Sequence, residues 1–177
     1  FDGSNDYVTM GDVLDFERTN TFSISAWYKL NVTSPSVTYS IVAKRTDSSP
    51  NSGYNLTIQG TVANDPFQFV MANDATNLMY IRFTRPNDRD WHHVVITYTG
   101  SSNASGFTVY VDGINTSFTI MTNNLSATTV TNYPFNIAAI NNAGQFFNGS
   151  IDEVRIYNRA LSASEVSRLY KLSRPKI

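Results

Sequence analysis

The sequence predicts an all-β protein, an antiparallel β-sandwich of two sheets with one short C-terminal helix. Three observations lead to this prediction. Apolar and polar residues alternate with a period of two in many short segments, as they do in half-buried strands. Turns rich in Gly, Asn, Asp and Ser separate these segments, and ten or more short strands divided in this way are typical of a sandwich. Only one stretch carries a convincing helix start signal.

The first clear strand is residues 22–30, in which every second residue from Phe22 onward is apolar. This alternation predicts a half-buried strand, with one face in the core and the other in solvent. Asp112 and Gly113 predict a tight hairpin turn. The same reasoning predicts further strands at residues 54–59, 67–71, 79–83, 91–100, 107–113, 114–120, 134–140 and 150–157.

The one predicted helix is the stretch SASEVSRLY, residues 162–170. Ser162 and Glu165 form a capping box, in which each side chain accepts a hydrogen bond from an otherwise unpaired backbone N–H of the first turn. Val166 and Leu169 then fall on one face, together with the tyrosine that ends the stretch. We expect the helix to lie against a sheet edge or the end of the sandwich.

Length and composition indicate one domain, residues 1–177, with a core large enough to be stable without disulfides or a structural metal ion. The chain begins at Phe1 without Met or a signal peptide, so we expect a piece of a larger protein.

The absence of cysteine excludes disulfides and thiolate zinc sites. A net charge of −1, with basic residues gathered only in the tail 168–176, argues against nucleic-acid binding. No run approaches the roughly 18 apolar residues of a membrane helix.

Six Asn-x-Ser/Thr sequons agree with an exposed, glycosylated protein. A chain rich in Asn, Ser and Thr also produces such matches by chance, so both interpretations stay open. The sequons begin at Asn31, Asn55, Asn103, Asn115, Asn124 and Asn148.

Five stretches are specific enough to suggest a family. They are FDGSNDYVTMG at 1–11, TFSISAWYKL at 21–30, DWHHVVITYTG at 90–100, FTVYVDG at 107–113 and FNGSIDEVRIYNRALSASEV at 147–166. In this order they resemble laminin-G-like, concanavalin-A-like jelly-roll domains, and the resemblance covers nearly the whole chain. It implies two stacked, curved antiparallel sheets of about six or seven strands each.

The resemblance also implies a class of function. Domains of this family are typically non-catalytic, often bind carbohydrate or another extracellular ligand, and are commonly joined to other domains of secreted or surface proteins. We therefore expect a lectin-like, carbohydrate-binding module, extracellular or surface-exposed, with a glycan or polysaccharide as its partner. Two alternatives stay open: an adhesion or structural domain that binds protein, and a cryptic glycan-active enzyme.

The carboxylates do not favour catalysis. Glycosidases with this jelly-roll fold place carboxylates at alternate positions of one strand, so that acid and nucleophile face the sugar together. None of the three glutamates, Glu17, Glu153 and Glu165, lies in that spacing. Asp152 and Glu153 are adjacent in a predicted strand and point to opposite faces. We predict no catalytic residues. Carboxylates that folding brings together stay open; the candidates are Asp74, Asp88 and Asp90.

His92 and His93 are adjacent in a predicted strand, so their side chains diverge and do not favour a shared metal ion. No serine stands in a Gly-x-Ser-x-Gly nucleophile context. The resemblance implies that this stretch is a structural strand, with Trp91 buried and one histidine hydrogen-bonded within the fold. We therefore expect structural roles for both histidines.

Asp152 interrupts an apolar strand. Strict alternation places it on the inner face with Val154 and Ile156, where a carboxylate without partners is costly. Glu153 then faces solvent or a neighbouring basic side chain. An inward aspartate predicts a structural role for Asp152.

Two partners for Asp152 stay open. The resemblance implies a structural calcium ion held by the N-terminal loop and the last strand, and the matching residues are Asp2 and Asp152. The alternative is that Asp152 accepts hydrogen bonds from the first loop or forms an ion pair with Arg155 or Arg159.

Sugar sites combine an aromatic ring with planar polar groups that make paired hydrogen bonds. The chain has ten tyrosines, most of which we expect in the core or on a sheet surface. Amides gather in the loop NNAGQ at 141–145. The predicted ligand set, whose convergence the sequence does not reveal, is Asn73, Tyr80, Arg82, Asn142 and Gln145.

Overall fold

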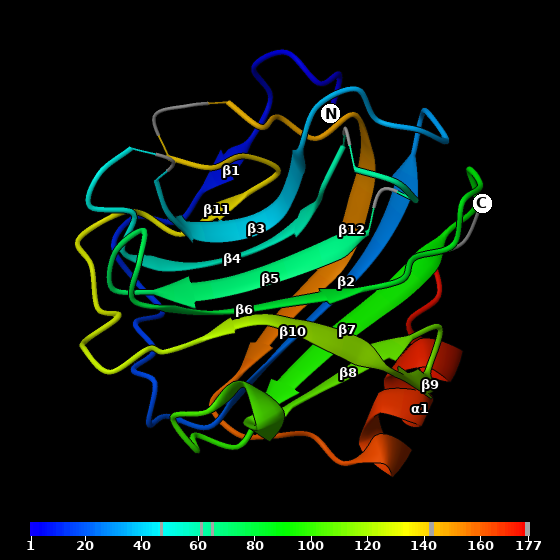
Figure 1. Ribbon diagram of the computed structural model, residues 1–177. Coiled ribbons are helices and arrows are strands. Elements are labelled where there is room, and N and C mark those ends of the chain that lie inside the picture. The colour runs from blue at the N-terminus through cyan, green and yellow to red at the C-terminus, as the bar shows by residue number, and fades with distance from the viewer. Residues whose placement is uncertain (47, 61, 65, 142–143, 176–177) are drawn as a thin grey trace.

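The computed structural model describes residues 1–46, 48–60, 62–64, 66–141 and 144–175. These residues form two stacked antiparallel sheets, and Figure 1 shows the larger one in front of the smaller. The larger sheet has the order β1 (Val8–Thr9), β11 (Asn136–Ile137), β3 (Tyr39–Arg45), β4 (Gly53–Ile58), β5 (Phe67–Ala72), β6 (Leu78–Phe83) and β10 (Phe118–Asn123). The smaller has the order β12 (Gly149–Tyr157), β2 (Phe22–Leu30), β7 (His92–Tyr98), β8 (Phe107–Val111) and β9 (Ile114–Thr116).

The predicted two-sheet jelly-roll sandwich is confirmed. Within the described ranges the sheets contain seven and five strands, so the second sheet is smaller than the resemblance implied. The core between them is rich in aromatic side chains. Phe69 of β5 lies 6.1 Å from Phe22 of β2 and 5.2 Å from Phe107 of β8, measured between ring centroids. These contacts join the two sheets.

Residues 114–120, predicted as one strand, belong to two strands in different sheets. β9 pairs with β8 in the five-stranded sheet, whereas β10 pairs with β6 in the seven-stranded sheet. Ser117 alone separates β9 from β10. The apolar residues on either side of Ser117 keep to the same alternate positions. The sequence pattern therefore gives no sign that the chain changes sheet there.

β3 is a strand that the alternation does not predict. Its register against β4 shifts between Ser40 and Val42, and both Ile41 and Val42 contribute to the core. Such a bulge places two successive side chains on one face and breaks the period of two. β1 is also unpredicted, since it is only two residues long. Conversely, the predicted strand 134–140 is reduced to the two residues of β11.

The predicted helix is confirmed as α1 (Ala163–Leu172), with the complete capping box between Ser162 and Glu165. Its position differs from the expectation. It covers the outer face of the five-stranded sheet, where Val166 packs with Val95 of β7. A short 3-10 helix, η1 (Ala104–Gly106), precedes β8. Within the described residues there is no helix with the length and hydrophobicity that a bilayer crossing needs.

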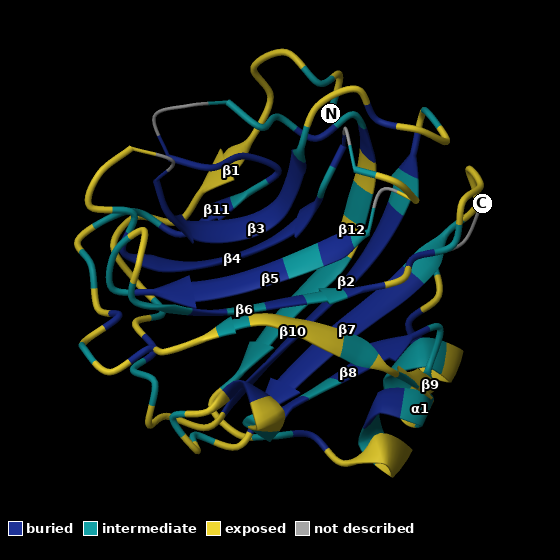
Figure 2. Cartoon of the chain, viewed as in Figure 1, coloured by how far each residue is buried: buried dark blue, intermediate teal, exposed yellow. Residues whose placement is uncertain are grey.

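The C-terminal half of α1 rests on Trp27 of β2. The indole is fully buried and stacks on Tyr170, with ring centroids 5.4 Å apart and planes inclined by 13°. Its Nε1 donates a hydrogen bond to Ser173 Oγ at 3.0 Å. As a result β2 is buried on both faces, not on one as the alternation predicts (Figure 2).

A bulge in β12 reverses the predicted orientation of Asp152. The register against β2 shifts between Asp152 and Arg155, so two residues of β12 face one residue of β2. Within this bulge Glu153 has a positive φ of 52°. Ile151 and Val154 pack against the core, and Asp152 is exposed on the outer face. The prediction of an inward Asp152 is wrong because strict alternation does not continue through the bulge.

Candidate functional site

The outer face of the seven-stranded sheet carries two rows of side chains that run across the strands. Leu56 and Ile81, which alternate with them, lie in the core, so the rows face away from it. The first row is Ser40, Thr57, Gln68, Arg82 and Thr119. The second row is Thr9, Asn136, Ala43, Asn55, Val70, Tyr80 and Thr122.

Tyr80 and Arg82 of β6 contact each other on this face. The guanidinium carbon of Arg82 lies 5.1 Å from the centroid of the Tyr80 ring, and Arg82 Nε donates a hydrogen bond to the phenol oxygen. The phenol donates in turn to Gln59 Oε1 at 3.4 Å. Burial raises the pKa of Tyr80 against the opposing effect of Arg82, so the phenol is neutral at physiological pH.

The other predicted ligand residues lie elsewhere. Asn73 is in the turn between β5 and β6, where its Nδ2 donates to a backbone carbonyl at 2.9 Å. Gln145 lies beside β3, since its backbone oxygen accepts the N–H of Ser40 at 2.8 Å. β3 is three strands from β6, which corresponds to about 14 Å. Asn142 lies outside the described residues. Of the predicted set, the contacts described bring together the β6 pair alone.

A cavity of about 490 Å³ opens beside β1 and β11, at one edge of the seven-stranded sheet. We call it the edge cavity; the residues that define it are Tyr7, Thr9, Asn136, Asn141 and Phe146. The rings of Tyr7 and Phe146 lie 6.3 Å apart, and Tyr7 is 51 % exposed. Thr9 and Asn136 are paired across the two strands, so the cavity is the end of the second row.

Hydrogen bonds orient the two amides of the edge cavity. Asn136 Nδ2 donates to Asn141 Oδ1 at 2.8 Å, and Asn141 Nδ2 donates to the backbone oxygen of Pro134 at 2.9 Å. Asn136 Oδ1 is buried and accepts no hydrogen bond from the described residues. Buried polar atoms normally have partners. A fixed amide pair beside two aromatic rings is a setting for a hydroxyl-bearing ligand.

The sequence pattern does not predict the edge cavity. It indicates the loop 141–145, which contains Asn141 and adjoins Phe146, but neither Tyr7 nor Asn136. Tyr7 lies in the stretch FDGSNDYVTMG, yet its local pattern does not distinguish it from a core tyrosine. The approach of Tyr7 and Phe146 depends on the pairing of β1 with β11, and strands of two residues leave no readable alternation.

His92 is held between two carboxylates at the start of β7. Its Nδ1 lies 2.8 Å from Asp112 Oδ2, and its Nε2 lies 2.7 Å from Asp88 Oδ1. Burial opposes the charged form, but Asp112 and Asp88 together raise the pKa of His92. Because both ring nitrogens are engaged, His92 is poorly placed to act as a general base. It instead connects the loop before β7 to the turn between β8 and β9.

His93 faces the opposite way and lies beneath α1. It is 1 % exposed, its Nε2 lies 2.8 Å from Ser25 Oγ, and burial lowers its pKa to about 4. The expectation that a histidine of this pair is hydrogen-bonded within the fold is confirmed. Trp91, by contrast, is half-buried and precedes β7, whereas the resemblance implied that it is buried. Trp27 is the tryptophan that is fully buried.

Of the remaining candidates, Asp74 has backbone partners for its carboxylate, and Asp90 contacts Asp88 through its backbone N–H. Asp74 Oδ1 accepts the backbone N–H of Thr76 at 2.7 Å and that of Asn77 at 2.9 Å, and the Thr76 N–H contributes most to lowering the pKa of Asp74. Asp90 donates its backbone N–H to Asp88 at 2.8 Å. In the part of the chain that the structure describes, no three His, Cys, Asp or Glu residues are grouped to hold a metal.

Asp2 and Asp152 do not lie together. Asp2 forms an isolated bridge with Asn148, four residues before Asp152 and thus about 13 Å away along extended chain. Calcium binds oxygens at roughly 2.3–2.6 Å, so this pair does not fit one ion. Asp152 Oδ1 accepts the N–H of Glu153 at 2.7 Å, and Glu153 pairs with Arg155, a basic neighbour as expected. Calcium binding itself stays a prediction.

The structure also bears on one sequon. Asn55 is 2 % exposed, and its Oδ1 accepts a hydrogen bond from Arg45 Nη1 at 3.4 Å. A glycan on Asn55 is therefore incompatible with the folded sheet.

Comparison with known proteins agrees with this architecture. A family model for the concanavalin A-like lectin/glucanases superfamily matches residues 2–167. A search of curated proteins finds no match.

Several solved structures share the fold. The binding domain of botulinum neurotoxin serotype G superposes with a TM-score of 0.71 at 21 % identity, covering 97 % of this chain and 41 % of that one. The binding domain of Paraclostridial Mosquitocidal Protein 1 gives 0.68 at 18 % identity, covering 94 % and 41 %. The native heptameric SAP-like pentraxin from Limulus polyphemus gives 0.68 at 15 % identity, covering 96 % and 79 %. The chain thus spans 41 % of the length of either toxin domain.

Proposed function

Because the chain belongs to the concanavalin A-like lectin/glucanases superfamily, we propose that it is a non-catalytic carbohydrate-binding module. The observation that carries this proposal is the edge cavity, where two aromatic rings and two fixed amides line one space. The proposed ligand is a neutral sugar residue of a glycan or polysaccharide. We also propose that the module is part of a larger extracellular or surface-exposed protein.

The edge cavity has the chemistry that a sugar requires. The exposed ring of Tyr7 offers a surface to the apolar side of a pyranose, and Phe146 forms a second apolar wall. Thr9, Asn136 and Asn141 supply hydroxyl and amide groups for sugar hydroxyls. The existing hydrogen bonds hold the amides in place, so little conformational entropy is lost on binding. Among the described lining residues none is charged, which favours a neutral sugar.

A neighbouring hollow supports a longer ligand. Gln145 lines this hollow, which has a volume of about 570 Å³ and shares Phe146 with the edge cavity. In this proposal Gln145 is an outer contact for a further unit of an oligosaccharide. The ligand does not extend to Tyr80 and Arg82, because Ala43, Asn55 and Val70, which lie between them and the edge cavity in the second row, are buried.

The absence of catalysis is also a proposal, supported by the partners of the carboxylates. Asp88 binds His92, Asp74 binds backbone N–H groups of its own turn, and Glu153 pairs with Arg155. A glycosidase needs two carboxyl groups on either side of one bond. The description of two similar structures as binding domains supports binding as the class of function.

The test is a glycan array at high protein concentration, followed by calorimetry with a monosaccharide from the strongest ligand. Tyr7→Ala and Phe146→Ala should each weaken binding by about tenfold or more, because each removes an aromatic wall. Tyr80→Ala is the matched control on the same face and should leave monosaccharide binding unchanged. Absence of any bound glycan, or equal losses in Tyr7→Ala and Tyr80→Ala, would overturn the site. Release of reducing sugar that a single carboxylate substitution abolishes would overturn the non-catalytic part.

A second candidate is a protein-binding adhesion domain. β10 is an edge strand of the seven-stranded sheet, and its Ile120 and Met121 are 44 % and 45 % exposed. An open edge with apolar side chains can pair with a strand of another protein. Binding to a protein partner that Ile120→Lys abolishes, together with an empty glycan array, would favour this function.

A further inference from the structure

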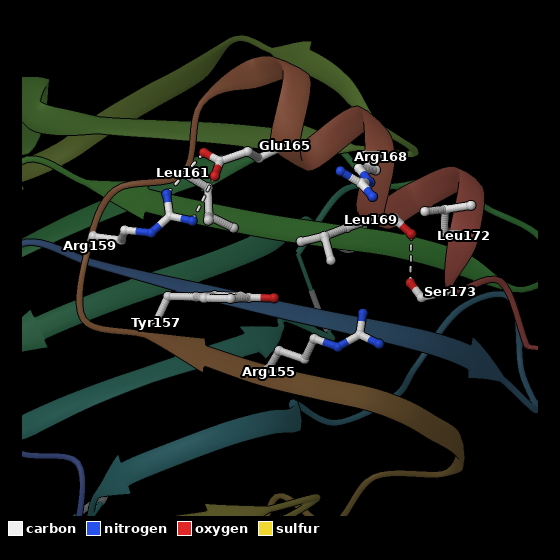
Figure 3. A pocket seen from close by; sticks show the side chains of 9 residues that line it. All are labelled: Arg155, Tyr157, Arg159, Leu161, Glu165, Arg168, Leu169, Leu172 and Ser173. Carbon is white, nitrogen blue, oxygen red and sulfur yellow. Dashed lines mark hydrogen bonds and ion pairs between the residues drawn. The ribbon is translucent and has the colours of Figure 1, made fainter.

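A groove of about 350 Å³ lies between α1 and β12, on the outer face of the five-stranded sheet (Figure 3). This is the opposite side of the sandwich from the edge cavity, and the function proposed above does not use it. We call it the arginine groove; the residues that define it are Arg155, Tyr157, Arg159, Arg168, Leu169 and Leu172.

The arginine residues are unequally paired. Arg159 makes two hydrogen bonds to Glu165, at 3.0 and 2.6 Å, and thereby holds the pKa of Glu165 down at about 2. Arg155 pairs with Glu153 through one nitrogen, which leaves most of its five N–H donors available. Arg168 is exposed and has no ion pair or hydrogen bond with any described residue. The lining of the groove therefore carries an excess of positive charge.

The unpaired charge lies beside an apolar surface. Figure 3 shows the Arg159–Glu165 pair at one end of the groove, and Arg168 and Arg155 on either side of Leu169 toward the other. Leu172 is 73 % exposed at the rim of the groove. The ring of Tyr157 lies below Leu161 and Leu169 in this view. Cations and apolar side chains thus share one concave surface.

We propose that the arginine groove binds an acidic peptide segment of a partner protein. A carboxylate of the segment pairs with the guanidinium groups of Arg168 and Arg155, because the planar fork of a guanidinium matches a carboxylate in two parallel hydrogen bonds. An apolar side chain of the same segment covers Leu169 and Leu172.

The apolar part of the groove favours a peptide over a sulfated glycan. A polyanionic glycan supplies charge but no apolar side chain to remove Leu172 from water. The whole chain has a net charge of −1, so the attraction for an acidic partner is local to this surface. Ser173, which also lines the groove, already bonds to Trp27 and to the backbone oxygen of Leu169 and is not needed for the ligand.

The test measures binding of the labelled peptide acetyl-Glu-Glu-Leu-Glu-Glu-amide by fluorescence anisotropy. Arg168→Glu should weaken binding by at least about tenfold, because a charge-assisted contact becomes a repulsion. Lys171→Glu is the matched control, since Lys171 is also exposed on α1 but does not line the groove. It should change the affinity by less than about threefold. Replacing the leucine of the peptide by serine should also weaken binding.

Three outcomes would overturn the proposal: no measurable binding of the peptide, equal losses in Arg168→Glu and Lys171→Glu, or tighter binding of a heparin oligosaccharide than of the peptide. Both substitutions are on the helix surface, and unchanged melting curves verify that each variant is folded. Tyr7→Ala should leave peptide binding intact. Failure of the glycan site and failure of the peptide site are therefore distinguishable.

Discussion

The outer faces of the two sheets are protected in different ways. On the five-stranded sheet, α1 covers Trp27 and Val95, so aromatic and aliphatic side chains are buried far from the central core. On the seven-stranded sheet, half-buried polar and aromatic side chains such as Tyr80 and Arg82 form the surface at β6, whereas β3 and β4 are buried on both faces. Both faces come from strands with the same alternation. What lies outside a sheet is decided by segments remote in sequence, and the proposed sugar site lies on the face without a helix.

The largest expected effect is the loss of the tryptophan beneath the helix. Trp27→Ala should lower the free energy of unfolding by about 3–5 kcal/mol, because it leaves a cavity under Tyr170 and removes the donor to Ser173. Tyr80→Ala, an aromatic on the other outer face, should cost about 1 kcal/mol. Urea denaturation measures both. If both substitutions lower the free energy of unfolding equally, α1 does not stabilise the outer face of the five-stranded sheet as described.

The buried His93 beneath α1 should also make the protein less stable in acid. The pKa of His93 falls from 6.5 to about 4 through burial, so its contribution to stability is complete above pH 6.5 and is lost as the pH falls through 4. The total is roughly 3 kcal/mol for this shift. Urea denaturation between pH 7 and pH 4 should give a shallower loss for His93→Gln than for wild type. Parallel curves would contradict a buried neutral imidazole.

His92, at the end of the same sheet, should act in the opposite direction. Its pKa is raised, so its contribution is complete below pH 6.5, the unfolded value, and is lost as the pH rises through the folded value. Wild type should therefore lose stability as the pH rises above 6.5, whereas His92→Gln should not. The effect is expected to be smaller than that of His93, because Asp88 is an exposed partner. An unchanged pH profile in His92→Gln would show that the two carboxylates do not retain the proton.

The smallest expected effect concerns Asp152, which is exposed on the outer face of the five-stranded sheet and is not covered by α1. Asp152→Ala should change the free energy of unfolding by less than about 1 kcal/mol, because the side chain is exposed and its one described bond is to Glu153. Any increase in melting temperature on adding calcium should persist in Asp152→Ala. It should disappear in Asp2→Ala if the N-terminal loop binds the ion. A large loss of stability in Asp152→Ala would instead indicate that the Asp152 carboxylate points inward and is buried.

Features that depend on neighbouring residues could be predicted from the sequence. The alternation of β2 and the capping box of α1 are encoded within a few residues, and the sequence predicts both elements. The position of α1 could not be predicted, since its partners on β7 and β8 are remote in sequence. The predicted orientation of Asp152 is wrong because the extra residue of a bulge has no clear sequence signal when the residue at positive φ is Glu153 and not glycine.

The same limit applies to the candidate site. Tyr80 and Arg82 are two residues apart on one strand, so their contact follows from the period of a strand. Tyr7 and Phe146 come from distant parts of the chain, and their approach requires the pairing of β1 with β11. The predicted ligand set therefore contains the local pair and omits the edge cavity.

The passage from β9 to β10 through Ser117 has a consequence for cooperativity. One residue links an edge strand of each sheet, so the two sheets cannot separate unless β9 leaves β8 or β10 leaves β6. We expect the two layers to melt as one unit, with a calorimetric enthalpy equal to the van't Hoff enthalpy. Inserting a flexible segment of about ten glycine and serine residues after Ser117 should loosen this coupling and lower the ratio of van't Hoff to calorimetric enthalpy below one.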